Sequence, residues 1–328
     1  MKESILNMLK DSSDTFISGQ YISEKLGVSR TAIWKYINQL KNDGYKIESV
    51  SKKGYKLIYS PDLLTFEEIH PLLTTSYIGN RILYFDSITS TNDKAKELAL
   101  NNYPHGSVII AEEQTNGRGR LGRSWISPKY KGIWMSIILR PNINTLDVPK
   151  VTQVTAAAVE KSLLNMNLKT YIKWPNDIIL NSKKICGILT EMSGEINNVN
   201  YVVVGIGINA NLDVEDLDGD LKEKATSIKI EENKSIKRKL LVAHILNNFE
   251  TLYNDLINFN NIESSIHICK ENSILIGKNI KIMSRKTITL AKALSLNENG
   301  ELIVQYENGK IVKVNSGEVS IRGENGYI

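Results

Sequence analysis

The first sixty residues carry apolar side chains at helical spacing in three short blocks. The blocks cover residues 2–10, 18–26 and 29–43. Ser18 and Ser29 stand where a side-chain oxygen would cap the second and third helices. In the third block Ile33, Ile37 and Leu40 fall at i, i+4 and i+7, the spacing of one helix face. The pattern predicts three helices separated by short turns.

Two short extended runs, residues 45–50 and 55–59, follow the third helix. The segment between them reads Ser-Lys-Lys-Gly, so the pattern predicts a β-hairpin with a basic tip at Lys52 and Lys53. Helix, turn, helix and basic hairpin in this order resemble the winged helix-turn-helix of bacterial repressors.

After Pro61 the pattern changes to extended apolar runs that alternate with helical ones. The extended runs cover residues 82–85, 107–111, 134–139, 171–174, 185–190 and 201–206, and the helical runs cover residues 93–100, 148–164 and 237–258. This alternation predicts an α/β (α+β) fold with a mixed central sheet. From about Ser273, short extended runs separated by Asn-Gly turns predict a small antiparallel barrel. The predicted domains are residues 1–61, 62–272 and 273–328.

Composition and charge narrow the class of protein. The 328 residues are 41% hydrophobic and 23% charged, which is typical of a globular chain with two or three domains. No apolar run approaches the roughly 20 residues of a membrane helix, and two cysteines far apart indicate reduced thiols in a cytoplasmic protein. Ten lysines and arginines against six acidic residues give the first sixty residues +4 of the total +5. This asymmetry indicates a basic module that binds a polyanion.

The third helix presents polar and basic side chains outward when Ile33, Ile37 and Leu40 face the core. The predicted DNA-contacting residues are Ser29, Arg30, Thr31, Trp34, Lys35 and Asn38, with Lys52 and Lys53 in the hairpin tip. Side chains of these kinds reach base edges and phosphates. The alternative is a small helical domain with a solvated basic face.

Residues 117–125 read GRGRLGRSW, so three glycines alternate with three arginines between predicted strands. Glycines let a loop fold closely over a ligand and move while it is empty. Arginine side chains offer planar, charged forks that suit phosphate and carboxylate. The segment therefore predicts a flap over an anionic ligand. The alternative, a disordered nucleic-acid tether, is usually longer, terminal and less aromatic.

Residues 173–177 read KWPND at the end of an apolar run. Pro175 is expected to end the strand and to leave Asn176 and Asp177 in a turn. Asp177 could bind Mg²⁺ there, and Lys173 could form an ion pair with a phosphate. By itself, Asn-Asp after proline is more often a simple turn.

Two more segments lie at the ends of predicted strands. Residues 183–189 read KKICGIL. They are predicted to begin a buried strand that has lysine at its start. Residues 205–209 read GIGIN, and their small side chains let a ligand approach the backbone. The second segment lacks the third glycine and the following helix of a dinucleotide-binding fingerprint.

Taken in this order, the motifs resemble those of the biotin protein ligases, specifically the bifunctional members that also repress the biotin biosynthetic operon. GRGRLGRSW, KWPND, KxxGIL and GxGIN carry the resemblance, with Ser90-Thr91-Asn92 ahead of them. It extends over almost the whole chain. We call the GRGRLGRSW segment, residues 117–125, the arginine loop. In this loop Leu121 stands where the family often has a basic or polar residue.

The resemblance implies an enzyme that makes biotinyl-5′-AMP from biotin and ATP and passes biotin to a lysine of the biotin carboxyl carrier protein. The catalytic cations that it implies are Lys184, Arg118 and Arg120. The biotin site that it implies comprises Ser90, Thr91, Asn92, Gln114, Gly117, Arg118, Gly119, Arg120, Lys184, Gly205 and Gly207. The ATP and Mg²⁺ site that it implies comprises Trp125, Lys173, Asn176, Asp177, Asn209 and Arg322, with Asp177 on the metal. The C-terminal domain is expected to be SH3-like.

The resemblance also implies that the adenylate acts as corepressor. It would promote a homodimer through the strand around residues 186–192, expected to be an edge strand, and the dimer would bind operator DNA. Ordering of the loop at residues 116–124 would couple the two events. Two alternatives stay open, a transcription factor that binds biotinyl-AMP without making it, and a lipoate ligase with a related core.

Overall fold

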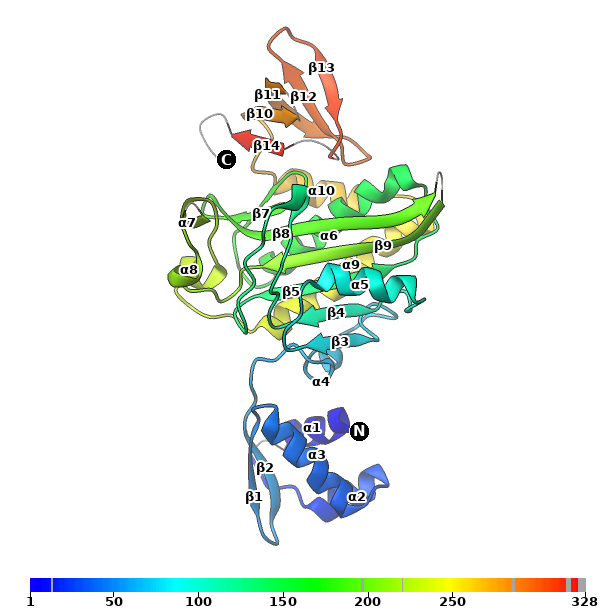
Figure 1. Ribbon diagram of the computed structural model, residues 1–328, viewed down its shortest axis with the longest axis vertical. Helices are drawn as coiled ribbons and strands as arrows, with labels where there is room; N and C mark the ends of the chain where they lie inside the picture. The colour runs from blue at the N-terminus through cyan, green and yellow to red at the C-terminus, as the bar shows by residue number, and fades with distance from the viewer. Residues whose placement is uncertain (13, 196–197, 220, 285–286, 317–319, 324–328) are drawn as a thin grey trace. The chain divides into compact units, whose positions relative to one another are not determined.

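The computed structural model describes residues 1–328 except 13, 196–197, 220, 285–286, 317–319 and 324–328. Within the described residues the chain forms two compact units, Met1–Pro71 and Leu72–Ile328 (Figure 1). None of the helices in the described part of the chain combines the length and apolarity that crossing a bilayer requires. The division into three domains stays a prediction.

The first unit has the elements that the sequence predicts and one more. Its elements are α1 (Lys2–Asp11), α2 (Gly19–Leu26), α3 (Arg30–Asn42), β1 (Lys46–Val50), β2 (Gly54–Tyr59) and α4 (Phe66–Ile69), followed by the 3-10 helix η1 (His70–Leu72). The Ser18 and Ser29 hydroxyls accept backbone N–H bonds at the starts of α2 and α3. Ile33, Ile37 and Leu40 are buried. The predicted caps and apolar face are confirmed.

The short helix α4 has no signal in the sequence pattern, and one buried carboxylate fastens it to the rest of the first unit. Glu68 accepts hydrogen bonds from the Tyr45 hydroxyl at 2.5 Å, from Lys10 at 2.9 Å and from the Ser60 hydroxyl at 3.1 Å. These bonds join α4 to α1, to the residue before β1 and to the end of the hairpin. The first compact unit therefore extends to Pro71.

A mixed seven-stranded sheet forms the centre of the second unit. Its strands are β3 (Ile82–Phe85), β4 (Val108–Ala111), β5 (Ile133–Leu139), β6 (Tyr171–Lys173), β7 (Asp177–Leu180), β8 (Lys183–Glu195) and β9 (Asn198–Ile208). Their order is β3-β4-β5-β9-β8-β7-β6. The β3–β4 pair is parallel and the other neighbours are antiparallel. The predicted mixed sheet is confirmed.

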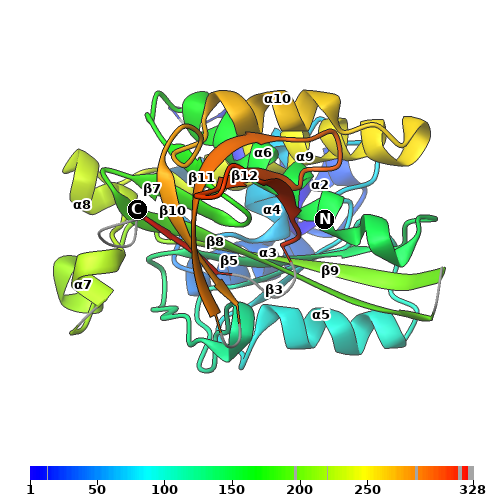
Figure 2. The same cartoon turned by 90° about the horizontal axis from the view of Figure 1, so that it is seen from above.

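Helices cover both faces of this sheet. The helices of this unit are α5 (Thr91–Leu100), α6 (Val148–Leu164), α7 (Leu221–Lys224), α8 (Ile228–Glu232), α9 (Arg238–Phe259) and α10 (Glu263–Glu271), with 3-10 helices η2 (Arg120–Gly122), η3 (Thr145–Asp147) and η4 (Val214–Asp216). Figure 2 shows α5 on one face and α6, α9 and α10 on the other. On the second face, α6 packs against α9 and α10.

The structure corrects the placement of Asp177. The sequence predicts that Pro175 leaves both Asn176 and Asp177 in a turn, but Asp177 is the first residue of β7 and pairs with Lys173 of β6. The turn consists of residues 174–176, and the chain re-enters the sheet at once. A strand of four residues directly after a proline is too short to show a periodicity of its own.

The structure also corrects the expectation of an edge strand at residues 186–192. The inner half of β8 pairs with β7 through Gly187, and Ile188 is still hydrogen-bonded to Asn176. Only the outer half, residues 190–195, pairs on one side alone, with β9, among the described residues. Half of the expected edge is therefore interior.

The C-terminal part of the second unit is an antiparallel sheet of five strands. They are β10 (Asn279–Ser284), β11 (Thr287–Leu296), β12 (Leu302–Tyr306), β13 (Ile311–Val314) and β14 (Ser320–Gly323), in the order β13-β12-β11-β10-β14. The predicted short strands are present. Among the described residues β13 and β14 are unpaired with each other, so the described sheet is open rather than a closed barrel.

One acidic side chain is buried where α6 packs under the sheet. Glu160 is completely buried, and its Oε2 accepts a hydrogen bond of 2.9 Å from the Thr170 hydroxyl. Its Oε1 has no hydrogen-bond partner among the described residues. Burial raises the pKa of Glu160 to about 7, although the Thr170 bond opposes the rise.

Replacing Glu160 with Gln should stabilise the second unit at alkaline pH. Because the pKa is raised on folding, the carboxyl group stabilises the fold below pH 4.5 and loses that contribution as the pH rises through 7. At pH 8.5 we expect the free energy of unfolding of Glu160→Gln to exceed that of the wild type by about 2 to 3 kcal/mol. At pH 5 we expect the two free energies of unfolding to differ little. Urea unfolding at both pH values measures this, with exposed Glu263→Gln as control. Equal curves at pH 8.5 would contradict the buried charge.

Candidate active site

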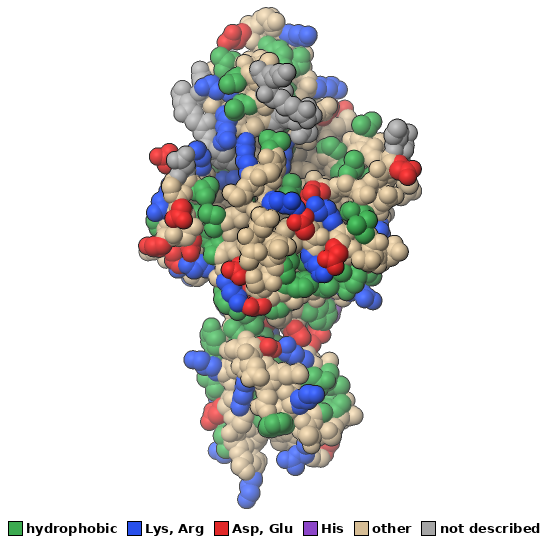
Figure 3. Space-filling model, in the orientation of Figure 1, with side chains coloured by type: hydrophobic (Ala, Val, Ile, Leu, Met, Phe, Trp, Pro, Cys, Tyr) green, Lys and Arg blue, Asp and Glu red, His purple; other side chains and the backbone are tan. Residues whose placement is uncertain are grey.

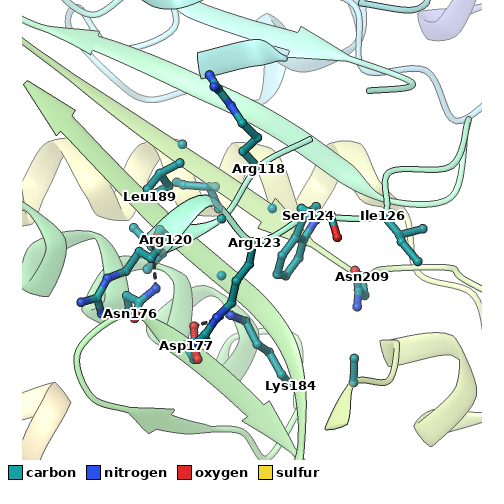
Figure 4. A pocket seen from close by; sticks show the side chains of 18 of the residues that line it. Arg118, Arg120, Arg123, Ser124, Ile126, Asn176, Asp177, Lys184, Leu189 and Asn209 are labelled. Atoms are coloured by element: carbon teal, nitrogen blue, oxygen red, sulfur yellow. Dashed lines mark hydrogen bonds and ion pairs between the residues drawn. The ribbon is translucent and has the colours of Figure 1, made fainter. Parts of the chain in front are cut away.

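One cavity of about 360 Å³ gathers most of the residues that the sequence singles out (Figure 4). The predicted residues that line it are Ser90, Thr91, Asn92, Gln114, Arg118, Gly119, Arg120, Trp125, Lys173, Asn176, Asp177, Lys184, Gly205, Gly207, Asn209 and Arg322. They meet because the loop after β4, the β6–β7 turn, the start of β8 and the end of β9 lie side by side. Gly117 is outside the lining, and a Cβ there would lie 2.5 Å from the Trp125 carbonyl oxygen.

One end of the cavity is a network of hydroxyls and amides at the start of α5. The Ser90 hydroxyl caps this helix by accepting from the Asp93 amide at 3.4 Å. The Gln114 Oε1 accepts from the Thr91 backbone N–H at 2.8 Å and from its hydroxyl at 3.0 Å. Gln114 Nε2 in turn donates to the Ser127 hydroxyl at 2.9 Å. This end is polar, uncharged and already ordered.

The middle of the cavity is a flat platform made by Trp125 on two glycines. Gly187 and Gly207 face each other across the β8–β9 pair. A Cβ on Gly207 would lie 2.8 Å from the indole, and one on Gly187 would lie 2.9 Å from it. Any side chain at these two positions would therefore displace the ring. The indole Nε1 is buried with no hydrogen-bond partner among the described residues.

The arginine loop is pinned to the body by its own backbone and by Arg120. The Gly119 N–H donates to the Arg123 carbonyl at 2.7 Å. The Arg120 guanidinium donates to Asn176 Oδ1 at 2.9 Å and to the Ser316 carbonyl at 2.5 Å. Leu121 has a left-handed backbone, with φ of 57°, and is 65% exposed at the tip. The C-terminal sheet and the loop are therefore linked directly through Arg120.

The three arginines of the loop point in different directions (Figure 4). Arg118 forms an ion pair with Asp93 of α5, beside the polar end. Arg123 extends toward Asp177 and Lys184. The sequence singles out Arg118 and Arg120 but not Arg123, although Arg123 belongs to the same alternating motif.

The far end of the cavity is strongly cationic. Lys184 Nζ lies 2.5 Å from the Asp177 carboxylate and 5.1 Å from the centre of the Trp125 ring. Lys173 is 3% exposed, and its burial, together with the nearby charges of Arg322, Lys184 and Arg123, lowers its pKa to about 7 despite the opposing effect of Asp177. Asp177 is the only carboxylate among the described lining residues. Such a cluster is suited to a polyanion.

Apolar and polar residues without a signal in the sequence complete the walls. Leu212 and Leu217 pack with Trp134 beside Trp125 and close the cavity on one side. Ser136 is fully buried in β5, and its hydroxyl lies 2.8 Å from the Thr91 hydroxyl. It supports the polar end from behind, and a serine inside an apolar run gives no indication of this role.

The predicted DNA-contacting residues belong to the first unit. Arg30, Thr31, Trp34 and Lys35 of α3 are exposed, and Trp34 reaches 59% exposure. Asn38 is half-buried, and the Ser29 hydroxyl is used as the α3 cap. In the hairpin tip, Lys52 and Lys53 are exposed, and Figure 3 shows basic side chains there. Arg30, Thr31, Trp34, Lys35, Lys52 and Lys53 are thus open to solvent on the first unit, and their contact with DNA stays a prediction.

Three sequence families match successive parts of the chain. They are the HTH domain over residues 2–56, the Biotin/lipoate A/B protein ligase family over residues 84–209, and the Biotin protein ligase C terminal domain over residues 275–322. The chain is 39% identical to the bifunctional ligase/repressor BirA of Bacillus subtilis over 98% of each chain. It is 33% identical to BirA of Escherichia coli over 59% of each chain. The biotin protein ligase of Aquifex aeolicus in complex with biotin and ATP superposes with a TM-score of 0.66 at 27% identity, covering 75% of this chain and 100% of that one.

Proposed function

The chain belongs to the family of bifunctional biotin protein ligases and repressors, and we propose that it joins biotin to the biotin carboxyl carrier protein and represses biotin synthesis genes. One observation carries the ligase proposal. A single cavity places a neutral hydrogen-bonding end and a cationic end on either side of an aromatic platform. Biotin has a neutral ureido ring and a carboxylate, and ATP supplies an aromatic base and a polyphosphate.

The first step joins two anions. A biotin carboxylate oxygen attacks the α-phosphorus of ATP, the bond to the β-phosphate oxygen breaks, and pyrophosphate leaves. Lys184, at the junction between the platform and the cationic end, offsets the charge on the carboxylate and the α-phosphate. Arg120 holds the loop over this point, and Arg118 lies beside the polar end. Preorganised cations of this kind lower the barrier because they need no rearrangement during reaction.

The polar end reads the ureido ring. Gln114 Oε1 is occupied by Thr91, so Gln114 offers the ligand its remaining Nε2 hydrogen. The Ser90 hydroxyl accepts the Asp93 amide and keeps its own proton for the ureido carbonyl. Asn92 lines the same end. Gly119 and Gly205 line the cavity, and the absence of a side chain at Gly205 leaves the space that Asn92 occupies. Gly117 lies outside the lining, where a Cβ would clash with the Trp125 carbonyl oxygen, so it would act by allowing the fold of the loop.

The platform and the cationic end bind ATP. Trp125 stacks with adenine, and Asn209 with the backbone at Gly207 forms the floor. Lys173, Asn176 and Arg322 hold the phosphates. Asp177 suits Mg²⁺, because this ion commonly uses one or two carboxylates together with substrate phosphates. The ion would reduce the negative charge of the polyphosphate.

In the second step the carrier lysine, as a free amine, attacks the acyl carbon of biotinyl-AMP. The bond between that carbon and the phosphate oxygen breaks, AMP leaves, and the nitrogen loses a proton to solvent as the amide forms. The exposed arginine loop tip at Leu121 lies beside the cavity and would be lifted to admit the lysine.

The winged helix-turn-helix supplies the repressor activity. Arg30, Thr31, Trp34, Lys35 and Asn38 would enter the major groove from α3, with Ser29 at the helix start. Lys52 and Lys53 would contact the neighbouring backbone. Biotinyl-AMP acts as corepressor by promoting a homodimer, so that two such units bind the two half-sites of a palindromic operator.

Residues 190–192, which belong to the outer half of β8, are the part of the predicted edge that remains available for pairing. Two copies could extend their sheets across it, and the carrier could use the same edge. Ordering of residues 116–124 over the adenylate would lower the entropy cost of forming the dimer.

Three domains would carry out these tasks, residues 1–61 on DNA, 62–272 as ligase core and 273–328 as an SH3-like domain. The C-terminal sheet supports the last assignment through its five antiparallel strands. It contributes Arg322 to the cavity and the Ser316 carbonyl to Arg120. ATP, carrier and operator are all cytoplasmic, and we place the protein there.

The direct test is acylation of a carrier domain with ATP and Mg²⁺, in which biotin and lipoate are compared by the mass of the product. We expect biotinylation, and we expect Lys184→Ala to fold normally yet slow adenylate formation at least a hundredfold, because a cation at the reacting oxygens is lost. Leu100→Ala, at an exposed position on α5, serves as control. A lipoylated product would make the chain a lipoate ligase, and binding of biotinyl-AMP without its synthesis would make it a sensor. Near-normal pyrophosphate release by Lys184→Ala would remove that residue from the role.

Arg120→Gly should affect the release of the adenylate more than its synthesis: release should become faster, and synthesis should slow by a smaller factor. The change removes the hydrogen bonds from Arg120 to Asn176 and to the Ser316 carbonyl. We expect the dissociation rate of biotinyl-AMP to rise at least tenfold, and lysines of unrelated proteins to become biotinylated. Stopped-flow dissociation measures the first effect. An unchanged rate would show that Arg120 does not retain the intermediate.

Operator binding should depend on the adenylate. Sedimentation is expected to give monomers without biotinyl-AMP and dimers with it, and operator affinity is expected to rise at least tenfold in parallel. Adding unmodified carrier in excess should reverse both effects if it uses the same edge. Equal operator affinity with and without biotinyl-AMP would leave a ligase whose DNA-binding unit is not switched by its intermediate.

A further inference from the structure

The side-chain amide of Asn92 is held by three neighbours that leave only its oxygen for a ligand. Asn92 Nδ2 donates to Glu191 Oε2 at 2.7 Å and to the Leu189 carbonyl at 3.3 Å. The Ser136 hydroxyl lies 2.6 Å from Asn92 Oδ1. A carboxylate and a carbonyl can only accept, so they fix the nitrogen on their side. Both hydrogens of Nδ2 are thereby used within the protein.

The position of the amide is as restricted as its orientation. Asn92 is 5% exposed and lines the cavity. A Cβ on Gly205 would lie 2.1 Å from Asn92 Oδ1, so the amide occupies the space left by that glycine. The carbonyl oxygen has two acceptor sites, and Ser136 uses one of them. What Asn92 can offer a ligand is therefore one acceptor for an N–H group.

Glu191 lies outside the cavity lining, on the outer half of β8. Its other oxygen accepts from Lys96 at 2.8 Å, and Lys96 lies 3.1 Å from Asp93. Asp93 is also the ion-pair partner of Arg118. One carboxylate thus contacts the amide of the polar end and a chain of charges that reaches the arginine loop.

We propose that Glu191 is a positioning residue, which holds Asn92 with its oxygen toward the ligand so that the site selects a ureido N–H. The inference rests on the proposed binding of biotin at this end. The ureido ring has two N–H groups, and an amide turned by 180° would present donors to them instead of an acceptor. Of the two acceptors that fix the nitrogen, Glu191 makes the shorter bond, at 2.7 Å against 3.3 Å for the Leu189 carbonyl, and it is the charged one, so it contributes more to the orientation.

The test measures biotin binding to the full-length protein by calorimetry without ATP. We expect Glu191→Ala to weaken biotin roughly tenfold, the effect of leaving a buried hydrogen-bonding group unheld, with ATP affinity unchanged. Two biotin analogues, each methylated on one ureido nitrogen, provide the specific readout. Wild type should discriminate against the isomer that lacks the N–H facing Asn92, and Glu191→Ala should lose most of that discrimination. General damage to the fold would weaken all three ligands equally.

Three further variants isolate the contact. Glu191→Gln, which keeps an acceptor for Asn92, should recover part of the affinity and carries the test if the alanine variant has a low Tm. Lys96→Met removes the other partner of Glu191 and should change biotin affinity less than twofold. Glu97→Ala, which removes an exposed ion pair with Lys94 on the same helix, should have no effect.

Unchanged biotin affinity in Glu191→Ala would overturn the inference. So would an equal loss for biotin and both analogues, or a loss of the same size in Lys96→Met. A wild-type protein that does not bind biotin would instead overturn the proposed function.

Discussion

The ion pair between Lys184 and Asp177 joins the starts of two neighbouring strands, β8 and β7, at a separation of 2.5 Å. Around it lie Lys173, Arg123 and Arg322, which repel one another in a partly dehydrated pocket. Asp177 offsets part of that repulsion, and in the proposed complex the polyphosphate of ATP would offset more of it. Burial, together with the nearby charges of Arg322, Lys184 and Arg123, lowers the pKa of Lys173, and in the proposed complex the bound polyphosphate would relieve the part that is due to these like charges.

The Trp125 platform belongs to the same cavity lining as the polar end and the cationic end. Because Gly187 and Gly207 pair across β8 and β9, the indole can lie against the sheet between the polar end and the cations. A molecule that spans the platform must present its hydrogen-bonding ring on one side and its anionic group on the other. In biotinyl-AMP the phosphate joins the biotin moiety to the adenosine, so in the proposed complex the ureido ring would lie at the polar end, the phosphate beside Lys184 and the adenine on the Trp125 ring.

The sequence predicts the helices of the first unit and the long elements of the second, because their periodicity is strong and their caps are local. It also brings the motifs to one site, since each lies at the end of a strand. Contacts between distant segments give no such signal. Asp177 lies in the sheet because β7 pairs with β8, and Arg118 forms an ion pair with Asp93 of α5. Ser136 and Glu191 contact Asn92 from positions that the sequence cannot distinguish from ordinary strand residues.

Strand β8 explains how ligation and repression could share one intermediate. Its inner half, paired on both sides, carries Lys184 and Gly187 into the cavity. Its outer half pairs on one side only and carries Glu191, which contacts Asn92 at the polar end. In the proposed function, a partner that pairs with the outer edge would therefore bind a strand whose side chains hold both ends of the ligand. A carrier and a second copy cannot occupy that edge together, so the supply of carrier would decide whether the adenylate is consumed or retained on DNA.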